Sequence, residues 1–218
     1  MIQNKELISF ITHVIAAAAA VVGIIVLAFV ATGNARLQFV SVVYGGSVCW
    51  LFVASSVYHA RKRDENDQSV WRKLDHIAIF FMIAGTYTAT CYAYLPPVWF
   101  YVIVSAQWAI VVFGIFFKFF CLNAPRVVYT LIYLAMGWMA VIPIHHLYTA
   151  MPGSQFALLI LGGVSFSVGA VFYAIKRPVI IPGWFGFHEI FHVMIMIGGA
   201  LHYIFVYRAF ALMNSLAR

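Results

Sequence analysis

The chain has 218 residues, of which 65% are hydrophobic and 9% are charged, and its mean hydropathy is +0.97. So few polar residues cannot cover the surface of a water-soluble domain, and the composition therefore excludes a soluble fold and predicts a polytopic membrane protein. The formal net charge of +7 is not gathered in a soluble basic module, so we expect membrane lipids and no nucleic acid as partners.

Seven apolar stretches, separated by charged and turn-forming residues, are each long enough to cross ~30 Å of hydrocarbon, which takes about 20 residues. They cover about residues 8–31, 37–60, 75–95, 98–118, 126–147, 156–175 and 185–212. The first stretch exceeds the ~7–15 residues of a signal-peptide core, so we expect it to be retained. The sequence therefore predicts an all-α bundle of seven transmembrane helices that forms one domain, residues 1–218.

The basic residues predict the orientation of this bundle. With a cytoplasmic N-terminus, the inside segments carry ten Lys and Arg residues, and the outside segments carry only Arg36, Arg208 and Arg218. Cytoplasmic segments of membrane proteins are enriched in Lys and Arg. We therefore expect the N-terminus in the cytoplasm and, after seven spans, the C-terminus outside.

Polar residues in the first three stretches are few. His13, near the start of the first, is expected to form a hydrogen bond to a neighbouring helix. Ser55 and His59 are four residues apart at the cytoplasmic end of the second, so they share a helix face. Asp75 opens the third, where an acidic residue in the first turn can act as a helix cap or belong to a functional site.

In the fifth stretch Pro143 is expected to bend the helix, because proline lacks a backbone N–H and clashes with the preceding turn. In the sixth, Gly162, Gly163 and Gly169 are typical of positions where helices pack closely.

His188 and His192 open the last stretch four residues apart, so both imidazoles can reach one metal ion. The topology places His59, Asp75 and this pair at one depth near the cytoplasmic interface. Three histidines and a carboxylate are typical of a zinc site with three nitrogen ligands and one open position. The alternative is a set of unrelated interfacial side chains that extend to the headgroups. His202 lies about 15 Å further along the helix, which favours a hydrogen-bonding or cavity role.

The segment from His188 to His192 also matches the H-E-x-x-H pattern of zinc peptidases, in which Glu189 would be the general base. Such a peptidase needs a third ligand, and no acidic residue follows Glu189. His59 would have to supply that ligand from upstream, so a peptidase remains an open alternative and the role of Glu189 stays undecided.

Several short motifs, each weak alone, together identify a family. They are Ser55-x-x-x-His59, Leu74-Asp75-His76, Gly85-Thr86-Tyr87-Thr88, Met136-Gly137-Trp138, Gly162-Gly163…Gly169 and His188-x-x-x-His192…His202. Over nearly its whole length, the chain resembles the hemolysin III branch of the progestin and adipoQ receptor superfamily, which is related to adiponectin receptors. The short N-terminal segment is similar to the bacterial branch, which implies the bacterial cytoplasmic (inner) membrane.

This resemblance implies that His59, His188 and His192 hold Zn²⁺, that Asp75 contacts a zinc-bound water and that Ser55 lies close by. Two departures from the family pattern, Ala89 in place of proline and Phe166 in place of tyrosine, do not affect these residues.

The predicted function is a zinc-dependent hydrolase of lipid amides or esters, similar to a ceramidase. Asp75 would orient or deprotonate water, and Ser55 would hydrogen-bond the water or an oxyanion. One alternative is a receptor or sensor with a structural zinc ion. Another is a pore-forming, hemolysin-like protein, although no helix carries a polar stripe. A bis-histidine haem is a minor alternative.

Overall fold

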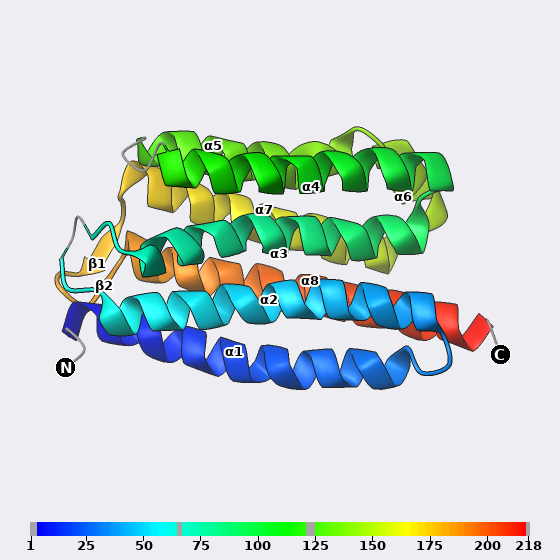
Figure 1. Ribbon diagram of the computed structural model, residues 1–218, viewed down its shortest axis with the longest axis horizontal. Coiled ribbons are helices and arrows are strands. Elements are labelled where there is room, and N and C mark those ends of the chain that lie inside the picture. The colour runs from blue at the N-terminus through cyan, green and yellow to red at the C-terminus, as the bar shows by residue number, and fades with distance from the viewer. Residues whose placement is uncertain (1–3, 65–66, 121–124, 217–218) are drawn as a thin grey trace.

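Long helices lie side by side along the long axis of the protein in the computed structural model, which describes residues 4–64, 67–120 and 125–216 (Figure 1). The six long helices are α1 (Asn4–Val30), α2 (Ala35–Arg61), α3 (Val70–Tyr94), α4 (Pro97–Phe120), α7 (Gly153–Ile175) and α8 (Phe187–Leu216). Between α4 and α7 the chain forms α5 (Arg126–Gly137), the 3-10 turn η1 (Trp138–Val141) and the short α6 (Ile144–Ala150). A two-stranded antiparallel hairpin, β1 (Val179–Ile181) and β2 (Phe185–Gly186), precedes α8.

Six helices within the described part of the chain are long and apolar enough to cross a bilayer. The segments Val127–Val141 and Ile144–Ala150, bent by 55° at a short break, make a seventh span if they count as one. The all-α transmembrane bundle is thus confirmed. The two chain ends lie at opposite ends of the bundle (Figure 1), while the assignment of one end to the cytoplasm remains a prediction.

The third helix begins earlier than its hydropathy indicated. It starts at Val70, and Ser69 caps it by accepting a hydrogen bond from the Arg72 N–H at 3.4 Å. Asp75 therefore lies in the second turn, and its interpretation as a first-turn cap is wrong. The reason is that Arg72 and Lys73 end the apolar run without ending the helix.

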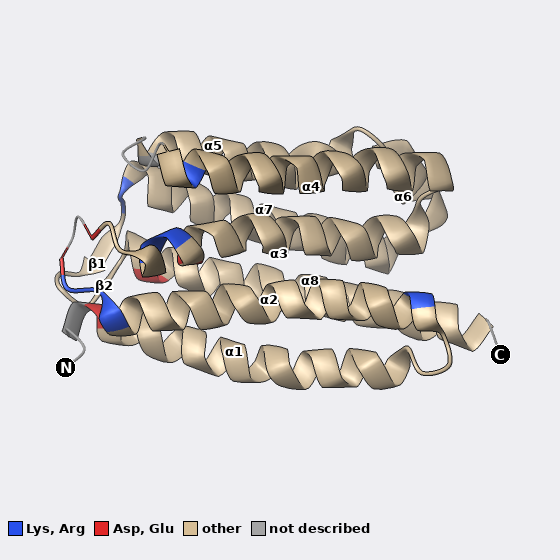
Figure 2. Ribbon diagram, viewed as in Figure 1, with Lys and Arg blue, Asp and Glu red and all other residues tan. Residues whose placement is uncertain are grey.

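Charged residues gather at the end of the bundle where α1 begins and α2 ends, as Figure 2 shows. We call this the charged end. α2 packs against both α1 and α3, and α8 packs against α7 and α1. The close approach of α1 and α2 depends on Gly45, because a Cβ built there would lie 2.7 Å from Ile24. These contacts bring the last turn of α2 and the first turns of α1 and α8 together at the charged end.

The break after α5 coincides with Pro143, which directly precedes α6, so the predicted bend is confirmed. Side chains from α3 and α4 form hydrogen bonds to backbone groups at the transition from α5 to η1. The Tyr87 hydroxyl donates to the Gly137 carbonyl at 2.7 Å and accepts from the Ala140 N–H at 2.6 Å. The Gln107 amide donates to the Met136 carbonyl at 2.9 Å. Irregular backbone at membrane depth requires such partners, because lipid supplies none.

Candidate metal centre

Three histidines from two helices meet at the charged end. His59 lies in the last turn of α2, and His188 and His192 lie in the first turns of α8. One potential ligand atom from each lies within 4.8 Å of those of the other two. His59 and His192 are buried, at 1% and 3% exposure, so these two rings do not extend to the headgroups as the interfacial alternative required.

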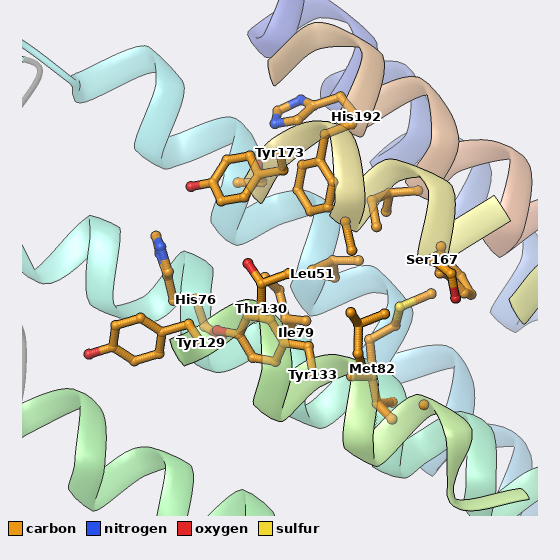
Figure 3. Close-up of a pocket in the computed structure, with 18 of the residues that line it drawn as sticks. Leu51, His76, Ile79, Met82, Tyr129, Thr130, Tyr133, Ser167, Tyr173 and His192 are labelled. Atoms are coloured by element: carbon orange, nitrogen blue, oxygen red, sulfur yellow. The ribbon is translucent and has the colours of Figure 1, made fainter. Parts of the chain in front are cut away.

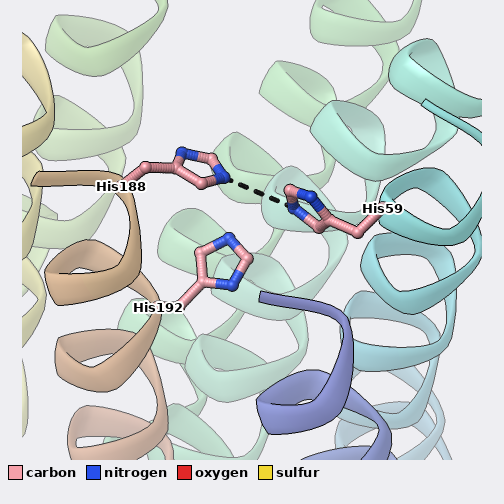
Figure 4. A group of neighbouring side chains, drawn as sticks. All are labelled: His59, His188 and His192. Atoms are coloured by element: carbon pink, nitrogen blue, oxygen red, sulfur yellow. Dashed lines mark hydrogen bonds between the residues drawn. The ribbon is translucent and has the colours of Figure 1, made fainter. Parts of the chain in front are cut away.

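The separation of the ring nitrogens suits one metal ion. The Nε2 atoms of His59 and His188 lie 3.4 Å apart, and a ring nitrogen of His192 points into the gap between them (Figure 4). Two ligands of a tetrahedral zinc ion with Zn–N bonds of ~2.0–2.1 Å lie about 3.3–3.4 Å from each other. The donor set and its spacing therefore fit a metal ion bound by three imidazoles.

Ser55 and Asp75, the two residues predicted to act on water, also lie together. Ser55 precedes His59 by one turn of α2, is 2% exposed and lies beside Asp75. Asp75 is near enough to His59 to interact with it electrostatically. The contact of Asp75 with His76, 3.5 Å from Oδ2 to Nδ1, is longer than a good hydrogen bond. All five predicted site residues thus come together in one region.

A cavity of about 710 Å³ runs into the bundle from this region. Ser55, Asp75, His188 and His192 border it at the charged end, and Leu147 and His202 border it elsewhere. Figure 3 shows part of its wall, in which apolar Leu51, Ile79 and Met82 are accompanied by the hydroxyl-bearing Thr130, Tyr133 and Tyr173. Ligand pockets typically have volumes of about 300–1,000 Å³ and mostly apolar walls with a few polar groups, so the cavity has the size and character of a small-molecule site.

His202 lies apart from the three clustered histidines, as expected. Its Nε2 bonds to the Leu159 carbonyl at 3.1 Å, and its ring packs against Phe166. Gly162 makes room for this ring, because a Cβ at that position would overlap it. His202 therefore has the hydrogen-bonding and cavity-lining role predicted for it.

Glu189, the acidic residue of the H-E-x-x-H pattern, is bonded to two neighbouring segments. Its Oε1 accepts from the Ser9 hydroxyl at 3.2 Å, and its Oε2 accepts from the Gly186 N–H at 2.8 Å. The carboxylate thus joins the start of α8 to α1 and to the hairpin. A general base needs a carboxylate oxygen free to reach water, so this geometry disfavours the peptidase interpretation.

Three residues of α1 lie against the cluster, of which Glu6 and Ser9 were not predicted from the sequence. Glu6 Oε2 accepts from His59 Nδ1 at 2.7 Å, and Ser9 bonds Glu189. His13 stacks on His192 with ring centroids 3.8 Å apart. Within the described residues neither ring nitrogen of His13 has a hydrogen-bond partner, so the predicted bond to a neighbouring helix is wrong. Glu6, Ser9 and His13 follow i, i+3, i+7 spacing, and this shared helix face was the available signal.

Comparisons with known proteins identify the family. The model of the haemolysin-III-related family matches residues 1–203. A "Hemolysin-3 homolog" of Bacillus subtilis (strain 168) is 31% identical over 199 residues, which cover 90% of this chain and 90% of that protein. "Hemolysin-3" of Bacillus cereus is 32% identical over 200 residues, covering 91% and 88%. The chain therefore belongs to the haemolysin-III-related family of membrane proteins.

Proposed function

We propose that this protein is a zinc-dependent hydrolase that cleaves an amide or ester bond of a membrane lipid at the cytoplasmic side of the bilayer. The observation that carries the proposal is the convergence of three imidazoles beside Asp75 and Ser55 at the end of a cavity. When bound there, zinc would supply Lewis acidity, which polarises a carbonyl and activates water.

His59, His188 and His192 would hold the ion, since their nitrogens have the required spacing. Three protein ligands leave one position for substrate or water, which distinguishes catalytic from closed structural zinc sites. The fourth ligand of a closed site would have to come from another side chain. Within the described residues, no fourth His, Cys, Asp or Glu joins this cluster.

Asp75 is the proposed general base. Its carboxylate borders the cavity and would accept a proton from the attacking water, then return it to the leaving amine or alcohol. Ser55 lies beside this carboxylate and would orient it. Among Glu6, Asp75 and Glu189, Asp75 is the one whose oxygens are not both held by hydrogen bonds to protein donors.

The cavity indicates what kind of molecule would reach these residues. Leu51, Ile79 and Met82 offer an apolar wall that suits a hydrocarbon chain. At the charged end, Lys62, Arg72, Lys118 and Lys176 also border the cavity. Cations at this position suit the phosphate of a lipid headgroup or a carboxylate product. A lipid with its chain in the bundle and its polar bond at the histidines fits both features.

The proposal is tested with purified protein in detergent, by metal analysis and by hydrolysis of a fluorescent N-acyl amide and its matching ester. Asp75→Asn should retain the metal content of the wild type while turnover falls by about 10²–10⁴-fold, the usual contribution of a general base. His192→Ala should lose the metal. Asp64→Asn, a change of an exposed carboxylate, is the matched control and should leave both unchanged.

Two results would refute the proposed hydrolase activity. One is wild-type protein that contains zinc but cleaves neither probe. The other is an Asp75→Asn variant with wild-type turnover. Zinc joining α2 to α8 as a structural ion would then be the better explanation.

A further inference from the structure

The outer contacts of His59 show how its ring orientation is determined. Its Nδ1 lies 2.7 Å from Glu6 Oε2, while its Nε2 faces His188. A carboxylate can only accept a hydrogen bond, so the proton of a neutral His59 lies on Nδ1. The unprotonated Nε2 is then the nitrogen that faces the other two rings. In metal sites of known function, a carboxylate on the outer nitrogen fixes the tautomer and orientation of a histidine ligand in this way.

A second contact holds Glu6 itself in place beside His59. It is 4% exposed, and its second oxygen accepts from the Lys62 ammonium at 2.6 Å. Burying an unpaired carboxylate is costly, and Lys62 compensates the charge. Both oxygens of Glu6 therefore have partners at the C-terminal end of α2, His59 in its last turn and Lys62 at its C-cap.

The same face of α1 touches the rest of the cluster. Ser9 bonds Glu189 at the start of α8, and His13 stacks on His192. Residues 6, 9 and 13 lie on consecutive turns of one helix face, so the first turns of α1 pack against His59, against His192 and against the start of α8. α1 supplies none of these three ligands, yet contacts the elements that carry them.

We propose that Glu6 is a positioning residue that holds His59 in the Nδ1–H tautomer and aims its Nε2 at the metal. This inference rests on the metal site of the proposed function, but not on hydrolysis. A competing role for Glu6 is purely structural, in which its ion pair with Lys62 joins α1 to α2 and the contact with His59 is incidental.

Three variants separate the two roles. Glu6→Leu removes both contacts. Glu6→Gln breaks the ion pair, but its amide oxygen can still accept the His59 Nδ1–H. Lys62→Met breaks only the ion pair. Zinc affinity is measured for each by competition with a chelator at fixed pH, and folding is monitored by circular dichroism and thermal unfolding.

If Glu6 positions His59, Glu6→Leu should weaken zinc binding by about 10–100-fold, the usual effect of losing such an outer partner. Glu6→Gln should recover most of that loss, and Lys62→Met should stay within about threefold of the wild type. In the metal-free wild type, ¹⁵N NMR should show His59 protonated at Nδ1, and this preference should disappear in Glu6→Leu.

Equal zinc affinity in Glu6→Leu and wild type would overturn the inference while leaving the proposed function intact. Similar losses of affinity and stability in Glu6→Gln, Glu6→Leu and Lys62→Met would also overturn it, in favour of the structural ion pair. If Glu6→Leu does not fold, the Glu6→Gln and Lys62→Met pair still decides between the roles. Wild-type protein that binds no zinc would refute the proposed function and this inference together.

Discussion

Tyr87→Phe tests whether one hydroxyl holds the broken span in place. The phenol donates to the Gly137 carbonyl at 2.7 Å and accepts from the Ala140 N–H at 2.6 Å, on either side of the transition from α5 to η1. Phenylalanine keeps the ring and removes both hydrogen bonds of the hydroxyl. Hydrogen bonds between transmembrane helices contribute on average about 0.6 and at most about 1.7 kcal/mol each. Losing two should lower the free energy of unfolding by about 1–3 kcal/mol.

The assay is equilibrium unfolding in mixed micelles with increasing denaturing detergent, followed by circular dichroism. Tyr92→Phe on the same helix is the matched control, because the Tyr92 ring packs against Phe100 and its hydroxyl makes no hydrogen bond within the described chain. A Tyr87→Phe variant as stable as Tyr92→Phe, within about 0.3 kcal/mol, would refute the reasoning, since the two hydrogen bonds of Tyr87 would then contribute nothing measurable to stability.

Two further predictions concern Glu189 and Gly162. Glu189→Gln should retain zinc and keep turnover within about threefold, because the side chain links Ser9 to Gly186. If Glu189 were the general base, turnover would fall by about 10²–10⁴-fold. Metal analysis and the fluorescent amide assay distinguish the two results. Gly162→Ala should lower the free energy of unfolding by about 1–3 kcal/mol, because the added methyl overlaps the His202 ring. Gly163→Ala, where a Cβ meets no atom within 4 Å, is its control, and equal stability of the two variants would contradict this packing.

The helices could be predicted because apolar length is a direct requirement of the bilayer. The pairing of His188 with His192 followed from helical periodicity alone, and the approach of His59 followed from the alternation of span directions. The start of α3 could not be predicted in this way, because hydropathy detects the edge of the membrane and not the end of a helix. α3 extends beyond that edge to Val70, where Ser69 caps its N-terminus.

The contacts around the cluster depend on which helix faces meet, and a single sequence does not reveal this. Glu6 is one of the six acidic residues of the protein, and it follows directly after Lys5 near the start of the chain. Nothing in this local sequence indicated a partner 53 positions away. Tyr87 belonged to a recognised motif, but its two backbone partners lie 50 and 53 residues further on. Hydrogen bonds across such separations follow from tertiary packing rather than from local pattern.

The carboxylates that border the cavity divide their roles through their partners. Glu6, Asp75 and Glu189 all line it. Glu6 uses its two oxygens on His59 and Lys62, and Glu189 uses its two on Ser9 and Gly186. Asp75 lies beside Ser55, and its 3.5 Å contact with His76 is weak because the Nδ1–H of that ring bonds the Arg72 carbonyl at 2.8 Å. A proton acceptor needs an oxygen that water can reach, so among these three Asp75 alone meets the requirement.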